Sequence, residues 1–136
     1  MRINDKIKEI EKYLDEFIEI MPDNFEEYKE AKNKAACERY FEKIVEAVID
    51  LSFLIIKDRG LKIPEEDKEV FDMLFLENII PEELAEKFKD AKGMRNIIAH
   101  EYGTIDDKIV FSSITNELIK DAEEFIKRIK LVYMLK

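Results

Sequence analysis

Apolar residues recur at helical spacing along almost the whole chain, and this pattern constrains the fold more than any other feature of the sequence. Residues three and four positions apart lie on one face of a helix, so each apolar stripe marks the side that packs into a core. Only three Gly and three Pro are spread over 136 residues, and no segment has the alternation of a strand. The pattern predicts an all-α fold, an antiparallel bundle of helices joined by short connections.

Five helices are predicted, and turn-forming residues separate them. The sequence MPDN follows the first helix, and Gly60 lies where the second is expected to end. Pro81 suits the first turn of the fourth helix, which Gly103 is expected to end. The predicted helices run from about Asp5 to Ile20, from Phe25 to Asp58, from Pro64 through Phe75, from Pro81 to Gly103, and from near Asp106–Ser113 to the C-terminus.

The apolar residues of these helices are predicted to form one core. The second helix carries the longest stripe, from Tyr40 to Ile55, and the stripes of the first and fourth helices include Ile18 and Ile97. A chain of 136 residues can bury a core without disulfides or metals. Residues 1–136 are therefore predicted to form a single domain.

The cysteine and histidine counts exclude several kinds of site. Cys37 is the one cysteine, and its apolar neighbours predict a small core residue. One Cys and one His cannot form a zinc site, and no metal or cofactor is predicted. The most apolar run, Ala47 to Ile56, is too short to span a membrane, and the N-terminus lacks the apolar core of a signal peptide. We expect a cytoplasmic protein without membrane contact.

The net charge of −9 disfavours non-specific adhesion to nucleic acid. Any contact with RNA must therefore be local or supplied by assembly. Lys87, Lys89, Lys92 and Arg95 make the predicted fourth helix the one locally basic stretch of this acidic chain.

That helix contains RNIIAHEYG, residues 95–103, which includes the only histidine of the chain. An α-helix turns about 100° per residue, so Asn96 and His100, four positions apart, share one line. Arg95 and Tyr102 are seven apart and share the neighbouring line, with Lys92 close to it. These side chains are predicted to form a polar band near the end of the helix.

These residue types could cleave RNA without a metal. The reaction needs a base for the ribose 2′-OH, an acid for the leaving 5′-oxygen and a cation for the charged phosphorane. Histidine serves in either proton role near neutral pH, and arginine binds phosphate bidentately. One chain supplies one histidine, so this chemistry requires a symmetric dimer that brings two copies of the band together. Spacing alone equally allows a histidine that complements the helix dipole and an arginine on a half-exposed face.

The second helix carries another polar line. Arg39 precedes Glu42 by three residues, and Glu46 and Asp50 follow at four-residue steps. Glu46 is interpreted as part of a solvated stripe. Asp50 lies between apolar neighbours, which favours partial burial with a cationic partner. Arg95 and Arg39 are the candidate partners, so Asp50 and Arg39 are predicted to support the site from behind.

The run MRNIIAHEY, residues 94–102, resembles the R-x4-H-x-Y signature of HEPN-domain toxins of the HepT type. The upstream run ACERYFEKIVEAVIDLSFLII resembles the long second helix of that family, with its Glu-Arg pair and an Asp near the end. The segment from Arg59 to Asn96 resembles the family's turn, short helix and entry to the motif helix. The resemblance covers nearly the whole chain and is densest from Ala36 to Asp106.

The resemblance implies a HEPN-like helical bundle that dimerises through the motif helix, with two R-x4-H motifs facing each other in a cleft. It implies a metal-independent endoribonuclease, the toxin of a type II-like toxin–antitoxin pair whose antitoxin is a minimal nucleotidyltransferase of the MntA type. Arg95 would bind and polarise phosphate, and His100 would transfer protons. Asn96, with Lys92 beside the motif, would orient the substrate. Tyr102 would receive AMP from the antitoxin, which would block the cleft with bulk and negative charge.

Two other functions remain open at this point. Some HEPN proteins are non-catalytic, nucleotide-binding or scaffold partners of nucleotidyltransferases, and the acidic charge suits that function better. The intact set of motif residues suits the ribonuclease better. A helical dimer with a purely structural role is the third interpretation.

Overall fold

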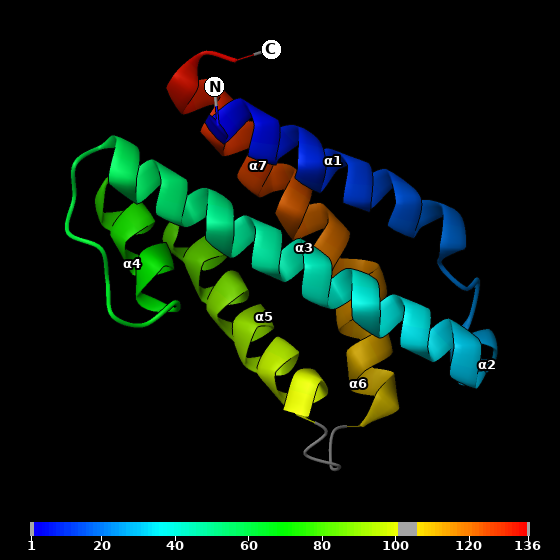
Figure 1. The fold of residues 1–136 in the computed structure, drawn as a ribbon. Coiled ribbons are helices and arrows are strands. Elements are labelled where there is room, and N and C mark those ends of the chain that lie inside the picture. The colour runs from blue at the N-terminus through cyan, green and yellow to red at the C-terminus, as the bar shows by residue number, and fades with distance from the viewer. Residues whose placement is uncertain (1, 101–105, 136) are drawn as a thin grey trace.

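The structure is a computed structural model that describes residues 2–100 and 106–135. Helices make up the ordered elements of these two ranges, and neither contains a strand, so the all-α prediction is confirmed (Figure 1). The elements are α1 (Arg2–Ile20), α2 (Phe25–Tyr28), α3 (Ala31–Asp58), α4 (Glu69–Leu76), α5 (Glu82–His100), α6 (Asp107–Ser112), the π-helix η1 (Ser113–Leu118) and α7 (Ile119–Tyr133).

The long helix α3 is the centre of an antiparallel bundle. Helix α1 packs along it in the opposite direction, with Glu16 of α1 near Tyr40 and Lys6 near Asp50. Helices α4 and α5 pack on another side of α3, and α7 packs against α5 (Figure 1). The start of α1 and the end of α7 lie at the same end of the bundle. The antiparallel arrangement predicted from the short connections is therefore confirmed.

Aromatic rings join the layers of the core. The Phe88 side chain of α5 is 1% exposed and stacks on Phe71 of α4, with ring centroids 5.5 Å apart. It also meets Phe125 of α7 edge to face at 5.4 Å. Cys37 is buried in the same core, as predicted, and burial raises the pKa of its thiol to about 11. The thiol is thus protonated and unreactive at neutral pH.

The predicted second helix, Phe25 to Asp58, is in fact two helices. Helix α2 ends after one turn, because Lys29 caps it and Glu30 is extended, with ψ 130°. Asn24 begins α2 by accepting a hydrogen bond from the Glu27 amide at 2.9 Å. The Asn33 side chain then donates to the Glu27 carbonyl at 2.8 Å, so that carbonyl is satisfied where the helix stops.

The third predicted helix begins five residues later than expected. Residues 65–68 form bends and turns, and α4 begins at Glu69 with Lys68 as its N-cap residue. The amides of Glu69, Val70 and Phe71 bond to carbonyls three residues back, at 3.1–3.3 Å. These tight turns hold the segment that precedes α4 against α5, where Asp67 contacts Lys92.

The last predicted helix is confirmed as one helical path, but it widens into a π-helix at η1. Asp106 caps its start by accepting from the Lys108 amide at 2.8 Å. The buried residues Val110, Ile114, Leu118 and Ala122 are spaced by four, which drifts around a regular α-helix of 3.6 residues per turn. The wider i→i+5 turn of a π-helix keeps such a row on one face.

Two predicted core residues are exposed. Ile18 of α1 is 52% exposed and Ile97 of α5 is 37% exposed. Each lies near the end of its helix, where few elements remain to cover it. In the residues that the structure describes, no helix combines the length and apolar character needed to cross a membrane.

Candidate functional site

The predicted site residues lie along the last turns of α5 and on the facing part of α3. Arg95 and Asn96 are on α5, and His100 is the final residue of that helix. The His100 side chain and Tyr102 lie outside the part of the chain that the structure describes, so the predictions for them stay predictions.

Arg95 reaches across from α5 to α3. Its Nη2 donates to Glu46 Oε2 at 3.4 Å, and its Nη1 donates to Asn96 Oδ1 at 3.3 Å. The side chain is 24% exposed, and its Nε is buried with no hydrogen-bond partner. Glu46 and Asn96 therefore hold the two terminal nitrogens of an arginine side chain that is three-quarters buried. The structure brings Arg95 and Asn96 together, as the band on α5 predicts.

Glu46 is the residue that the sequence analysis assigned to a solvated stripe. Its side chain is 57% exposed, as that interpretation expects, but it is also the carboxylate that contacts Arg95. The spacing within α3 could not reveal this contact, because the partner lies 49 residues further along the chain.

Lys92 contacts a different segment from the one that Arg95 contacts. Its Nζ is 3.2 Å from Asp67 Oδ2, and the Lys92 side chain is 11% exposed. An ammonium group this buried next to a carboxylate ties the 64–68 connection to α5. The predicted role of Lys92 in orienting a substrate stays a prediction.

The predicted partner of Asp50 is also different. Asp50 Oδ2 lies 3.7 Å from Lys6 Nζ of α1, and the Asp50 side chain is 54% exposed. Arg39 is 67% exposed and pairs with Glu42 on its own helix at 4.0 Å. Asp50 thus has a cationic partner and is about half buried, as predicted, but the partner is neither Arg39 nor Arg95, because α1 packs along that part of α3 and offers Lys6.

Each lysine and arginine of α5 is paired with at least one carboxylate. Lys87 Nζ lies 3.4 Å from Asp121, and Lys89 Nζ lies 3.1 Å from Asp72 and 3.3 Å from Glu86. Lys92 and Arg95 are paired as described above. The locally basic stretch that the sequence predicts is thus largely neutralised by its neighbours in space.

An open groove lies beside the motif, between the first half of α3, the last turn of α5 and the start of α6. Its walls include Arg39 and Glu42 of α3, Ile97 and Ile98 of α5, and Asp107 of α6. Lys34 and Asp107 form an ion pair of 2.9 Å at its edge. The groove thus combines charged side chains with the partly exposed Ile97.

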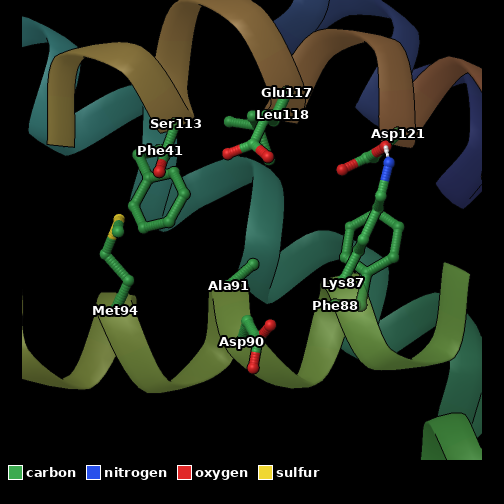
Figure 2. Close-up of a pocket in the computed structure, with 10 residues that line it drawn as sticks. All are labelled: Phe41, Lys87, Phe88, Asp90, Ala91, Met94, Ser113, Glu117, Leu118 and Asp121. Atoms are coloured by element: carbon green, nitrogen blue, oxygen red, sulfur yellow. Dashed lines mark hydrogen bonds and ion pairs between the residues drawn. The ribbon is translucent and has the colours of Figure 1, made fainter. Parts of the chain in front are cut away.

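A second hollow, a partly open pocket of about 100 Å³, lies between α5 and the η1–α7 segment. Figure 2 shows the ion pair of Lys87 and Asp121 at one end and the apolar side chains of Phe41 and Met94 at the other. Asp121 is 9% exposed, and burial raises the pKa of its carboxyl group, an effect that Lys87 opposes. Lys87 and Met94 of α5 lie, by helical spacing, on a different face of the helix from Asn96 and from position 100.

The residues that the structure describes contain no group of three or more His, Cys, Asp or Glu side chains placed to hold a metal ion. What the arrangement offers is one arginine held at both terminal nitrogens, next to the helix turn that carries the only histidine. An arginine placed in this way can bind a phosphate oxygen once its carboxylate partner moves aside.

Comparison with known proteins relates these features to one family. A family model described as "Ribonuclease HepT-like" matches residues 3–129. The mRNA nuclease HepT of Shewanella oneidensis is 33% identical over 89 residues, which are 65% of this chain and 66% of that protein. A protein of Archaeoglobus fulgidus is 36% identical over 86 residues, 63% of this chain and 64% of its own length. The chain thus matches slightly less than two thirds of the length of these curated relatives.

Solved structures match over more of the chain. A tri-AMPylated HEPN toxin of Shewanella oneidensis, in complex with MNT antitoxin, superposes with a TM-score of 0.88 at 26% identity. That match covers 95% of this chain and 96% of the toxin chain. A toxin–antitoxin structure with AMP-PNP matches with a TM-score of 0.86 at 25% identity, over 95% and 97% of the two chains.

Proposed function

The chain belongs to the HepT-like ribonuclease family, and we propose on that basis that it is the toxin of a toxin–antitoxin pair. In this proposal it is a metal-independent endoribonuclease that acts in the cytoplasm as a homodimer. A nucleotidyltransferase antitoxin holds it inactive by transferring AMP to Tyr102. Arg95 and His100 carry out the cleavage, and Asn96 orients them and the substrate.

The observation that carries the proposal is the position of Arg95. Its side chain is three-quarters buried, and Glu46 and Asn96 anchor its guanidinium. Arg95 lies little more than one helical turn before His100. A fixed guanidinium binds a phosphate with less loss of freedom than a mobile surface arginine. The geometry therefore supports Arg95 as the group that binds the scissile phosphate and stabilises the phosphorane.

Cleavage is proposed to proceed by transfer within the RNA strand. His100 of one copy accepts the proton of the ribose 2′-OH, and the 2′-oxygen attacks the adjacent phosphorus. His100 of the second copy donates a proton to the leaving 5′-oxygen as its bond to phosphorus breaks. The products are a 2′,3′-cyclic phosphate and a 5′-hydroxyl, so neither water nor a metal ion takes part in this step.

Two features support a dimer through this region. Each chain has one histidine, so the acid and the base must come from two chains. The groove beside the motif exposes Ile97 in the company of Arg39 and Asp107. A partly apolar groove lined by charges of both signs suits an interface with a second copy of the same surface.

Control by AMP transfer is supported by the structural relatives. One of them is a HEPN toxin that carries AMP in a complex with its MNT antitoxin partner. We propose that Tyr102, two residues beyond the histidine, is the acceptor in this chain. Incubation with a nucleotidyltransferase encoded beside it and with ATP should add the mass of AMP to the wild type and not to Tyr102→Phe. Equal labelling of both proteins would show that a residue other than Tyr102 receives the AMP.

The ribonuclease proposal is tested with purified protein and a labelled single-stranded RNA in EDTA. Wild type should cleave, and Arg95→Ala and His100→Ala should each lose activity by about 100-fold or more. Arg128→Ala is the matched control, because Arg128 is an arginine paired within α7 at 2.8 Å, on another helix. Equal cleavage by the wild type and both site variants would reject the proposed site.

The same assay separates the ribonuclease from the non-catalytic alternative. A net charge of −9 and the neutralised cations of α5 favour a protein that presents a surface to a nucleotidyltransferase and does not degrade RNA. That alternative predicts no cleavage by the wild type, together with retained binding to the nucleotidyltransferase by Arg95→Ala. Sedimentation at several protein concentrations tests the dimer separately.

A further inference from the structure

Lys68 differs from the cations of α5 that lie near it. Lys89, Lys92 and Arg95 each have a carboxylate within 3.4 Å or less. The Lys68 side chain is exposed and makes no ion pair or hydrogen bond within residues 2–100 and 106–135. Beside α5 it is therefore an ammonium group still available to an external anion.

The position of this ammonium group is defined by Gly93 on α5. A β-carbon built on Gly93 would lie 3.5 Å from Lys68 Nζ, so the ammonium group lies directly over the glycine. The absence of a side chain at this position leaves the surface of α5 open beneath Lys68. The adjacent residue Asp67 is tied to the buried Lys92 of α5 at 3.2 Å, which anchors the connection that carries Lys68.

Gly93 is on the same line of α5 as the motif. Asn96 is three residues further on and His100 is seven, which are separations that bring positions onto one side of an α-helix. At 1.5 Å per residue, Gly93 lies about 4.5 Å before Asn96 and about 10 Å before the backbone of His100. Lys68 thus extends the line of the motif towards the N-terminus of α5.

The location of Lys68 is unfavourable for helix stability. Lys68 is the N-cap residue of α4, and its side chain makes no capping hydrogen bond. The N-terminus of a helix carries partial positive charge, so a cation there is disfavoured by the helix dipole. Neither capping nor ion pairing accounts for a lysine at this position.

We propose that Lys68 binds a backbone phosphate of the RNA that flanks the scissile phosphate. The inference rests on the proposed ribonuclease function. A strand with its scissile phosphate at Arg95 and His100 would run along the line of α5 and pass Lys68 with a neighbouring phosphate. Contact with a phosphate is independent of sequence, so Lys68 contributes affinity and strand direction, not base specificity.

The test measures binding of a fluorescent single-stranded RNA by anisotropy, in a His100→Ala background that prevents cleavage. Lys68→Met removes the charge and keeps most of the stem, and Lys68→Arg restores a cation. Lys62→Met is the matched control, because Lys62 is an exposed lysine of the same connection and also makes no ion pair in the described structure.

Lys68→Met should weaken RNA binding about tenfold at low salt and lower the slope of log affinity against log salt by about 0.7, the loss of one phosphate contact. Lys68→Arg should bind within about twofold of the parent, as should Lys62→Met. In the catalytically active protein, Lys68→Met should raise KM and leave kcat unchanged, because Lys68 does not contact the reacting atoms.

Two outcomes overturn the proposal in different ways. If Lys68→Met binds RNA as well as Lys62→Met while Arg95→Ala abolishes cleavage, Lys68 is not a phosphate-binding residue and the ribonuclease proposal stands. If the parent protein neither binds nor cleaves RNA, both proposals fail. The thermal unfolding midpoint of Lys68→Met should be no lower than that of the parent, because the cation it removes is disfavoured at the N-terminus of α4. Weaker binding then reports on the contact and not on folding.

Discussion

Arg95 of α5 and Glu46 of α3 face each other across the bundle, with Nη2 and Oε2 3.4 Å apart. The pair holds the guanidinium in place and at the same time occupies one of the nitrogens that a phosphate would need. An anion that enters the site must therefore compete with Glu46 for Arg95.

Glu46→Gln is expected to strengthen RNA binding by about two- to fivefold at low salt, because it removes the negative charge nearest to Arg95. Stability should change by less than about 1 kcal/mol, since Glu46 is more than half exposed. RNA anisotropy and urea unfolding measure the two effects. Glu42→Gln, which removes the partner of Arg39 on the same line of α3, is the control. Weaker binding by Glu46→Gln would mean that anchoring Arg95 matters more than competition.

Asp67 and Lys92 should respond unequally to substitution. Asp67→Ala leaves a buried ammonium group without its carboxylate and should lower the free energy of unfolding by about 1–2 kcal/mol. Lys92→Met replaces that group with an apolar side chain and leaves Asp67 nearly half exposed to water, so it should cost less. Urea unfolding of both variants gives the comparison. A larger loss for Lys92→Met would contradict this view of the pair.

Gly93→Ala should stabilise the protein by about 0.5–1 kcal/mol, because alanine favours a helix interior over glycine. The new β-carbon would meet only Lys68 Nζ at 3.5 Å, which is ordinary van der Waals contact. Thermal unfolding at a fixed protein concentration measures the effect. A destabilised variant would indicate that a partner approaches the bare surface of α5 at this position.

Asp121 should make stability depend on pH. Burial raises the pKa of its carboxyl group above the ordinary value of 3.8, so the folded state binds this proton more tightly than the unfolded state. The free energy of unfolding of the wild type, relative to Asp121→Asn, should therefore fall as pH rises from 3.8 through the raised pKa. Urea unfolding of both proteins between about pH 3 and pH 7 tests this. If the free energy of unfolding of the wild type, relative to Asp121→Asn, instead rises with pH, the ion pair with Lys87 affects the Asp121 carboxyl group more strongly than burial does.

The fold could be predicted well because its helices bury apolar stripes whose period is visible in the sequence. The errors fall where a local contact overrides that period. The Asn33 side chain satisfies the Glu27 carbonyl and ends α2 inside a continuous helical pattern. The π-helix η1 could not be found in the same way, because apolar residues four positions apart also suit a regular α-helix.

The candidate site could be predicted only in part, for a different reason. Spacing placed Arg95 and Asn96 on neighbouring positions of one helix, and the structure joins them. Spacing within one helix could not reveal the partners of Lys92 and Asp50. These partners, Asp67 and Lys6, lie on other segments whose approach depends on tertiary packing. Lys68 carried no signal in the sequence at all, since its position over Gly93 exists only in the folded chain.

The pairing of the α5 cations with carboxylates has a kinetic consequence. At physiological ionic strength, charges beyond about 8 Å are screened, so an approaching RNA strand first meets the field of a protein with net charge −9, whose α5 cations are already paired with carboxylates. Diffusional encounter should then be slowed by repulsion, and its rate constant should rise when salt is added. Most RNA-binding proteins attract their ligand from a distance, whereas this one would capture RNA only after contact.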